Sequence, residues 1–153
     1  MRALIQRVRR CAVSVADGSR SEIGEGMLVF LGVGQNDTRE DAEYLAGRCA
    51  TLRMFRDAEG KMNHSVREVN GEIMVVSQFT LYADTKKGNR PGYSDAADPK
   101  TAEGFYGQFV TLLRTAIAPL KVATGWFGAE MTVEIVNDGP VTLLLESKRP
   151  SAS

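Results

Sequence analysis

Residues 26–34 read GMLVFLGVG, and this stretch decides the fold of the chain. Its apolar side chains fall on both alternating faces, which is typical of a strand that is covered on both sides. We therefore expect it to lie in the centre of a sheet. On its amino-terminal side, residues 2–8 and 11–15 mix aliphatic and polar side chains as two further strands do, and the turn-forming residues 17–19 follow them.

Two helices are predicted after the central strand. Asp37 and Glu40 have the spacing of a capping box, and Asp98 followed by Pro99 is typical of a second helix start. The second helix is expected to end before Pro119. Apolar residues that recur at helical intervals are Ala42, Leu45, Ala46, Cys49 and Leu52 in the first helix and Phe105, Phe109, Leu112, Leu113 and Ala116 in the second.

Further strands are predicted between and after the helices. Residues 72–79 alternate as a strand, and residues 82–99 form a long polar loop. Residues 131–136 and 141–146 also alternate. Because the intervening residues 137–140, NDGP, have the composition of a tight turn, this last pair is predicted to form a hairpin.

The composition limits what the chain can be. Its 153 residues fit one compact domain, and 19 Lys and Arg balance 19 Asp and Glu, so binding to a polyanion has to rely on local clusters of charge. Apolar runs are shorter than the roughly 20 residues of a membrane-spanning helix, and no signal peptide is evident, so a soluble, cytoplasmic protein is expected. The expected fold class is α/β, with a largely antiparallel sheet and two main helices in one domain over residues 1–148, and a flexible tail at 149–153.

Histidine and cysteine are scarce. His64 is the single histidine, which excludes a histidine-rich metal site within one chain, and its polar surroundings favour a solvated side chain over a catalytic base. Cys11 and Cys49 lie far apart without a CxxC motif, so both are expected to be buried thiols. Neither a metal site nor a cofactor is predicted.

Two short segments carry the candidate chemistry. Residues 77–81, SQFTL, end an apolar strand in three hydrogen-bonding side chains, which can hold a reactive carbonyl but, taken alone, more often satisfy turn amides. Residues 137–142, NDGPVT, read alone as a turn. Together and in this order, the two segments resemble the signatures of the D-aminoacyl-tRNA deacylase family. Other stretches that resemble the family are MRALIQRV at 1–8, LGVG at 31–34, GKMN at 60–63, LYADTKKG at 81–88, SDAA at 94–97 and ATGWFGAEM at 123–131.

The resemblance implies a barrel-like homodimer whose active sites are built from both subunits. Ser77, Gln78, Phe79 and Thr80 would line the pocket of one chain, and Gly139–Pro140, joined by a cis peptide bond, would enter from the other. The family hydrolyses the ester between a D-amino acid and the terminal adenosine of tRNA, as part of translation quality control, and some members also remove glycine. The resemblance implies no metal and no cofactor.

An aminoacyl ester is already activated, so its hydrolysis requires placement and stabilisation of an oxyanion more than a strong acid or base. Backbone N–H groups around Gln78, Phe79 and Thr80 are the candidate oxyanion donors. Two roles stay open for Thr80. Its hydroxyl acts as the nucleophile, or it positions groups while a ribose hydroxyl of the tRNA assists an attacking water, and we favour the second.

Chiral selection would follow from the main chain at Gly139–Pro140, which the resemblance places where an L side chain would collide. Gly139 has no Cβ that would occupy the approach path. The resemblance also implies that Arg7 orients this turn, the alternative being a solvated strand-end charge. Phe127 would cap the pocket, and a core aromatic is its alternative.

Three cations of the long loop, Lys86, Lys87 and Arg90, are candidate contacts to tRNA phosphates, and solvated surface is the alternative for each. The competing function is a non-catalytic nucleic-acid-binding protein that kept the same fold. The intact SQFTL and NDGPVT segments argue against it. Comparing the hydrolysis of D-tyrosyl-tRNA with that of L-tyrosyl-tRNA would discriminate the two functions.

Overall fold

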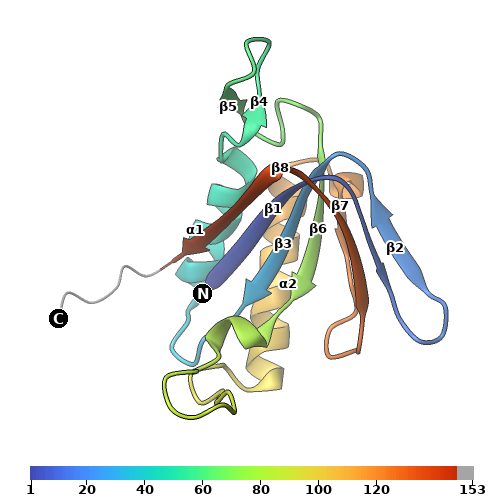
Figure 1. The fold of residues 1–153 in the computed structure, drawn as a ribbon. Coiled ribbons are helices and arrows are strands. Elements are labelled where there is room, and N and C mark those ends of the chain that lie inside the picture. The colour runs from blue at the N-terminus through green and yellow to red at the C-terminus, as the bar shows by residue number, and fades with distance from the viewer. Residues whose placement is uncertain (148–153) are drawn as a thin grey trace.

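The computed structural model describes residues 1–147, except for the side chain of Leu120. A six-stranded mixed sheet runs in the order β2-β1-β3-β6-β7, and β8 pairs with β1 beside this path (Figure 1). The sheet curls until its edge strands β2 and β7 lie close together, which confirms the barrel-like α/β class. The main elements are β1 (Arg2–Ser14), β2 (Arg20–Ile23), β3 (Gly26–Gly32), α1 (Arg39–Thr51), β6 (Glu72–Ser77), α2 (Pro99–Ala116), β7 (Val122–Thr124) and β8 (Thr132–Glu146). The short elements are β4 (Phe55–Arg56), β5 (Met62–His64) and the 3-10 helices η1 (Phe79–Tyr82) and η2 (Pro119–Lys121).

The predicted central strand is confirmed. β3 pairs antiparallel with β1 and parallel with β6, and all its residues except Phe30 are buried. Each parallel step from β3 to β6 and from β6 to β7 is bridged by a helix, and both helices lie on the same face of the sheet (Figure 1). Covering by helices on one face and by the curled strands on the other explains why β3 is apolar at both parities.

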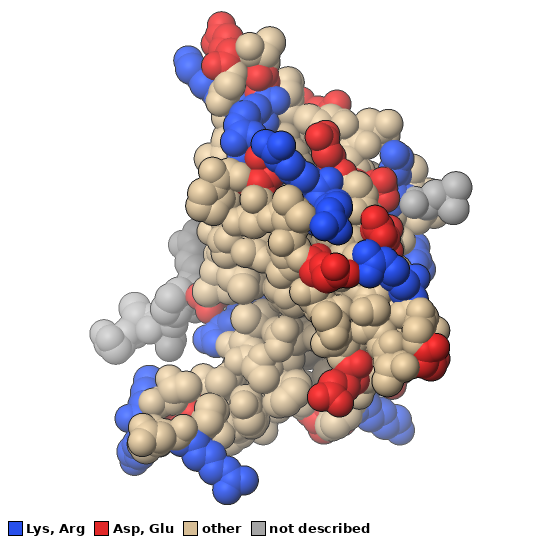
Figure 2. Space-filling view, turned by 45° about the vertical axis from the view of Figure 1, so that its right-hand side comes forward, with Lys and Arg blue, Asp and Glu red and all other residues tan. Residues whose placement is uncertain are grey.

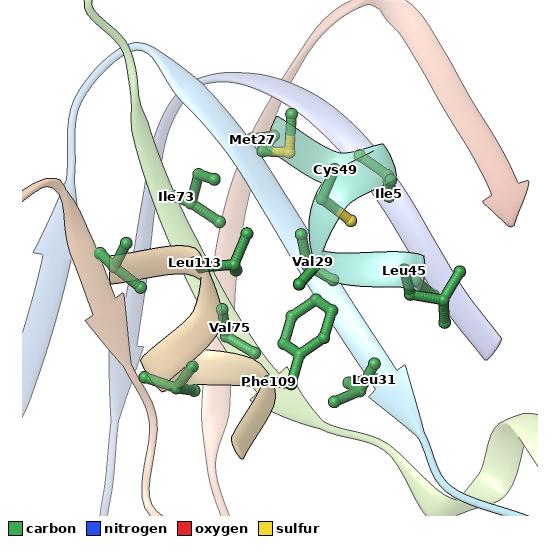
Figure 3. Close-up of a cluster of buried hydrophobic side chains, with 14 of the residues drawn as sticks. Ile5, Met27, Val29, Leu31, Leu45, Cys49, Ile73, Val75, Phe109 and Leu113 are labelled. Atoms are coloured by element: carbon green, nitrogen blue, oxygen red, sulfur yellow. The ribbon is translucent and has the colours of Figure 1, made fainter. Parts of the chain in front are cut away.

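Alternate residues of the strands form two separate cores. On the helix face, Ile5, Val29 and Val75 pack with Phe109 of α2 and Leu45 of α1 (Figure 3). On the opposite face, a second cluster lies inside the curl of the sheet. Its buried members are Val8, Cys11, Val13, Ile23, Leu28, Met74 and Val76. Both cysteines are buried free thiols, as predicted, and burial raises the pKa of Cys49 to about 12 and that of Cys11 to about 11.

The helix starts are partly as predicted. α2 begins as expected, with the Asp98 carboxylate accepting a hydrogen bond from Thr101 N at 3.1 Å and Pro99 in the first turn. The start predicted for α1 is wrong by one residue, since the capping box joins Thr38 and Asp41. Asp37 is instead engaged by the amino group of Met1, at 2.6 Å from its Oδ1. The buried stripe of α2 is Tyr106, Phe109, Val110 and Leu113, whereas Phe105, Leu112 and Ala116 are only half-buried.

The prediction of two amino-terminal strands is wrong. Residues 2–14 form the single strand β1, and the exposed pair Arg9 and Arg10, which interrupts the apolar pattern, lies where its pairing with β8 is irregular. The predicted hairpin at 131–146 is also wrong. Residues 132–146 form one strand, β8, and both of its halves pair antiparallel with β1.

The NDGP segment is therefore an insertion in a continuous ladder. Gln6 pairs with Thr142 and Val8 with Asn137, so residues 138–141 stand opposite Arg7 alone. The side-chain amide of Asn137 donates to the carbonyls of Arg7, at 2.8 Å, and Val141, at 3.1 Å. This amide spans the insertion with side-chain hydrogen bonds, which is why the strand continues past a sequence that resembles a turn.

Other predictions need small adjustments. The strand predicted at 72–79 ends at Ser77, because the chain turns into η1. The loop predicted at 82–99 contains a bridge between Asp84 and Gly92 but no strand or helix within residues 83–98. His64 lies at the end of β5 in the β4–β5 hairpin rather than in a turn. The tail expected at 149–153 lies outside the described residues. Over residues 1–147, no helix is long and apolar enough to cross a membrane.

Candidate active site

The first part of the candidate site is the carboxyl end of β6. Ser77 pairs with Leu31 of β3, and Gln78 N donates to the Leu31 carbonyl at 2.8 Å, after which the chain turns into η1. Phe79 is 57% exposed, and its ring meets the edge of Tyr93 at a centroid distance of 5.0 Å. The motif thus presents polar groups and an aromatic ring at a sheet end, as the sequence suggests.

The polar groups of this motif are directed toward one another. Gln78 Nε2 donates to Thr80 Oγ1, so the amide orients the hydroxyl. The backbone N–H groups of Phe79 and Thr80 belong to the first turn of η1, where helix geometry supplies no acceptor within the helix. Of the three expected oxyanion donors, these two remain, because the N–H of Gln78 is bonded to Leu31.

η1 is held against the end of β3 by close packing. A Cβ on Gly34 would lie 2.9 Å from the Tyr82 ring, and a Cβ on Gly32 would lie 3.0 Å from Leu81 Cβ. Arg2 donates to the Leu81 carbonyl at 2.7 Å and lies 4.6 Å above the centre of the Tyr82 ring. Two glycines and one arginine therefore set the position of the segment that carries Phe79 and Thr80.

A largely apolar cavity of about 560 Å³ opens beside Ser77, Gln78 and Phe79. Phe127 lines this cavity and lies 5.7 Å, between ring centres, from Tyr106. The Tyr106 hydroxyl donates to the Val75 carbonyl at 2.9 Å, and burial raises the pKa of this tyrosine to about 12. Other side chains on the wall are Val33, Tyr93, Ala97, Ala102 and Met131. The cavity offers room for an organic group next to the hydrogen-bonding motif.

The second part is the segment opposite Arg7. The Gly139–Pro140 peptide bond is cis, and both residues are exposed. Gly139 has a φ of +140°, and a Cβ there would come within 2.7 Å of Val141 N. Backbone conformation and the close approach both call for glycine at this position.

Arg7 contacts this segment from the buried side. It is 3% exposed, so it is not the solvated strand-end charge of the alternative interpretation. Its Nε donates to the Asp138 carbonyl at 3.1 Å, and its Nη1 donates to the Met54 carbonyl at 2.7 Å. Burial and the nearby Arg56 lower the pKa of Arg7, whereas Asp138 raises it. The arginine thus connects the residue before Gly139 to the interior.

Within one chain, the two parts lie at opposite ends of the sheet (Figure 1). Arg7 pairs with Met27, which pairs with Ile73, whereas Ser77 pairs with Leu31. The two parts are therefore separated by four residues along β6, or about 13 Å at roughly 3.3 Å per residue. A single chain does not bring the SQFT and Gly–Pro segments together.

Sequence reasoning missed several side chains of these two parts. Tyr93 lies in the long loop, where no periodic pattern predicts a neighbour, and Tyr106 lies in α2 directly after Phe105, the residue that the predicted stripe contains in its place. Asp138 precedes Gly139 directly, and Arg56 donates to its carboxylate at 3.2 Å. In the sequence, the Arg56–Asp138 contact is indicated only by an acidic residue in a predicted turn of a chain that contains many arginines.

The single histidine and its acidic partner lie outside the candidate site. His64 Nδ1 lies 3.0 Å from Glu68 Oε2 on the β4–β5 side of the chain, and neither residue lines the cavity at Ser77. Hydrogen bonds from Ser65 and His64 lower the pKa of Glu68 to about 2. Over residues 1–147, no cluster of His, Cys, Asp and Glu has a geometry that could hold a metal ion.

The predicted RNA contacts are exposed. Lys86, Lys87 and Arg90 lie on the loop between η1 and α2. Figure 2 shows blue side chains on the protrusion at the lower left, where this loop extends from the molecule. The loop follows the segment that carries Phe79 and Thr80, so its charges lie on the same side of the fold as the first part of the site.

Comparison with known proteins gives consistent similarities. The family model described as D-Tyr-tRNA(Tyr) deacylase matches residues 4–146. A D-aminoacyl-tRNA deacylase of Dehalococcoides mccartyi is 52% identical over 97% of this chain and 95% of its own length. One of Thermotoga petrophila is 51% identical over 97% and 99%. A solved structure of a c-Myc DNA unwinding element binding protein superposes with a TM-score of 0.92 at 43% identity, covering 97% of this chain and all of the other.

Proposed function

The chain belongs to the D-Tyr-tRNA(Tyr) deacylase family, and we propose that it hydrolyses the ester bond of D-aminoacyl-tRNA, releasing free tRNA and the D-amino acid. It is a carboxylic ester hydrolase of translation quality control. The family match confirms the resemblance that the SQFTL and NDGPVT segments show. The observation that carries this function is the family match over residues 4–146, which includes both segments. The test is hydrolysis of D-tyrosyl-tRNA with L-tyrosyl-tRNA as the control. Equal inactivity toward both would refute the function.

The end of β6 supplies what ester hydrolysis requires. The N–H groups of Phe79 and Thr80 would bind the oxyanion, and loss of one such donor typically costs about 10²–10³ in rate. The cavity beside Ser77 would receive the terminal adenosine or the amino acid, with Phe127 on its wall. These assignments rest on the family's motifs and on the position of Ser77, Gln78, Phe79 and Phe127 around one cavity, while Thr80 follows Phe79 in η1 and does not itself line the cavity.

Thr80 would position groups rather than attack the ester. Its hydroxyl accepts a hydrogen bond from the Gln78 amide, which is a donor and cannot remove the hydroxyl proton. A ribose hydroxyl of the tRNA would then assist the attacking water. Substrate whose terminal 2′-hydroxyl is replaced by hydrogen should be cleaved far more slowly, and an unchanged rate would contradict this mechanism.

A homodimer would unite the two parts of the site. Since they are separated by about 13 Å along the sheet at roughly 3.3 Å per residue, Gly139–Pro140 of one protomer would enter the pocket of the other. A suitable contact surface exists on the sheet face away from the helices. Leu4 pairs there with Phe30 and with Leu144, which is 54% exposed, and Figure 2 shows a broad area without charged side chains.

Mixed dimers test the shared site. We expect Phe79→Ala and Gly139→Arg homodimers to be inactive, and each mixed dimer to keep one site with both native segments. After random exchange of subunits, about a quarter of the native activity should return, because half of the dimers are mixed and each has one intact site. No recovery, despite mixed dimers observed by native mass spectrometry, would show that each site comes from one chain.

Chiral selection would come from the exposed backbone at Gly139–Pro140. Its carbonyls would contact the substrate's α-amino group and exclude an L side chain by collision, while hydrogen or a D side chain would fit. Glycyl-tRNA would therefore also be a substrate. We further propose that the enzyme acts in the cytoplasm and binds tRNA phosphates through Lys86, Lys87 and Arg90.

The alternative function is binding of nucleic acid without catalysis. It is favoured by one observation, the similarity to a protein whose name describes a DNA unwinding element binding protein. Specific affinity for duplex DNA, together with no cleavage of D-tyrosyl-tRNA, would support this alternative. Cleavage of the D-substrate would reject it as the main function.

A further inference from the structure

The carboxylate of Asp138 is surrounded by guanidinium groups. Arg56 Nη1 lies 3.3 Å from Oδ1 and 3.2 Å from Oδ2, and Arg7 Nε lies 3.3 Å from Oδ2. Arg9 approaches Oδ1 at 3.7 Å. Asp138 is the residue directly before Gly139, so these contacts act next to the exposed Gly139–Pro140 segment.

The three arginines do not hold Asp138 in the same way. Arg7 is buried and already divided between the main-chain carbonyls of Met54 and Asp138, whereas Arg9 is largely exposed and lies beyond hydrogen-bond distance. Arg56, which is half-exposed, reaches both carboxylate oxygens from its Nη1 atom and so restrains the position of the carboxylate. Of the three arginines, Arg56 is therefore the one within hydrogen-bond distance of both oxygens, whereas Arg7 reaches Oδ2 alone.

The Asp138 carboxylate borders an open cavity, so the contact with Arg56 is needed to restrain it. A polar cavity of about 360 Å³ is lined by Arg7, Arg56, Asp138 and Glu72, so packing does not confine Asp138 on that side. Arg56 comes from β4, in the hairpin that stands at the end of the molecule where β8 bends (Figure 1). Without this arginine, the Asp138 side chain and the peptide that follows it would gain freedom to move.

We propose that Arg56 is a positioning residue, which holds the Gly139–Pro140 segment in place for chiral selection through its contact with Asp138. The proposal rests on the proposed function of that segment, and it makes the β4–β5 hairpin a part of the selective machinery. Small displacements of positioning groups have large effects on rate, up to about 10²-fold for 1 Å. Arg56 acts on the Gly139–Pro140 backbone through the Asp138 side chain and does not itself contact the substrate.

The test is a double-mutant cycle of Arg56→Met and Asp138→Asn, with Arg56→Lys as the conservative variant and Arg67→Met as the matched control on an exposed arginine without these contacts. Arg56→Met should lower kcat/KM for D-tyrosyl-tRNA about 5–10-fold, mostly through kcat, and should lower the ratio of D to L hydrolysis. In the Asp138→Asn background, the same change should cost less than about twofold. Arg56→Lys should recover part of the rate, and Arg67→Met should behave as the native enzyme.

Three outcomes would overturn the proposal. One is full additivity of the two substitutions. Another is a loss confined to KM that disappears at high salt, which would make Arg56 a phosphate contact. The third is an unchanged D to L ratio in Arg56→Met. Thermal unfolding confirms that each variant is folded, and the Arg56 and Arg67 variants decide the question alone if Asp138→Asn fails to fold. Inactivity of the native enzyme would instead refute the proposed function.

Discussion

At the scale of single residues, the Gly–Pro segment depends on the absence of a side chain. Gly139→Ala would place a Cβ 2.7 Å from Val141 N and 2.8 Å from Val141 Cγ2, at a φ of +140° that alanine rarely adopts. The backbone has to shift, and with it the surface proposed to read the α-carbon. We expect kcat/KM for D-tyrosyl-tRNA to fall at least about tenfold. Unchanged kinetics in a folded dimer would contradict the proposed placement.

A second glycine tests how η1 is positioned. Gly34→Ala would place a Cβ 2.9 Å from the Tyr82 ring and displace the helix that begins with Phe79 and Thr80. We expect lower kcat and lower stability. The matched control is Gly47→Ala on the exposed face of α1, where nothing lies within 4 Å of the new Cβ, and which should stabilise the protein by up to about 1 kcal/mol. Equal behaviour of the two variants in steady-state kinetics and thermal unfolding would refute this role of Gly34.

At the scale of elements, the cap of α2 gives a pH-dependent prediction. Hydrogen bonds from Thr101 hold the pKa of Asp98 below its usual value. The folded carboxyl group therefore stabilises the protein above the ordinary pKa of aspartate, and this contribution is lost as the pH falls through the lowered value. At pH 7, Asp98→Ala should lower Tm by a few degrees, and the difference from the native protein should close in strong acid.

Thermal unfolding of both proteins over a pH series measures this difference. Asp95→Ala is the control, because Asp95 is an exposed aspartate of the same loop that caps no helix. A Tm difference for Asp98→Ala that persisted unchanged at pH 2 would show that the side chain does not act through its charge.

The helices and strands also show which parts of the fold can be predicted from the sequence and which cannot. β3 and α2 could be predicted because their patterns report local burial and local capping, as Val29 and Asp98 illustrate. The continuity of β8 could not, because it depends on pairing with a strand about 130 residues earlier and on the bonds of the Asn137 amide to Arg7 and Val141. Within the site, SQFT and Gly–Pro were found as motifs. Their supports Arg2, Tyr82 and Arg56 were not, since those contacts join distant parts of the chain.

At the scale of the whole molecule, a net charge of zero means that tRNA binding has to depend on a local cluster. Replacing Lys86, Lys87 and Arg90 with alanine should weaken binding and reduce the salt dependence. The slope of log K against log salt should decrease by about 0.7–0.9 for each phosphate contact that is lost. Fluorescence anisotropy with labelled tRNA at several salt concentrations measures it.

The control for this measurement is Arg48→Ala, which removes an exposed cation from α1 on another part of the surface. Its slope should equal that of the native protein. A triple variant with an unchanged slope would locate the phosphate contacts elsewhere.

The insertion of residues 138–141 opposite Arg7 bears on whether this segment can be moved into another protein. Both flanking halves of β8 stay in register with one partner strand, so the insert is bounded on each side by ordinary antiparallel ladder. The shape of the insert depends on side chains around it: Arg7 and Asn137 bond the backbone there, and Arg56 reaches the Asp138 carboxylate from the β4–β5 hairpin. Grafted into an unrelated antiparallel pair with Arg7 and Asn137 alone, the same four residues should therefore be less well ordered than in a graft that also supplies a counterpart of Arg56.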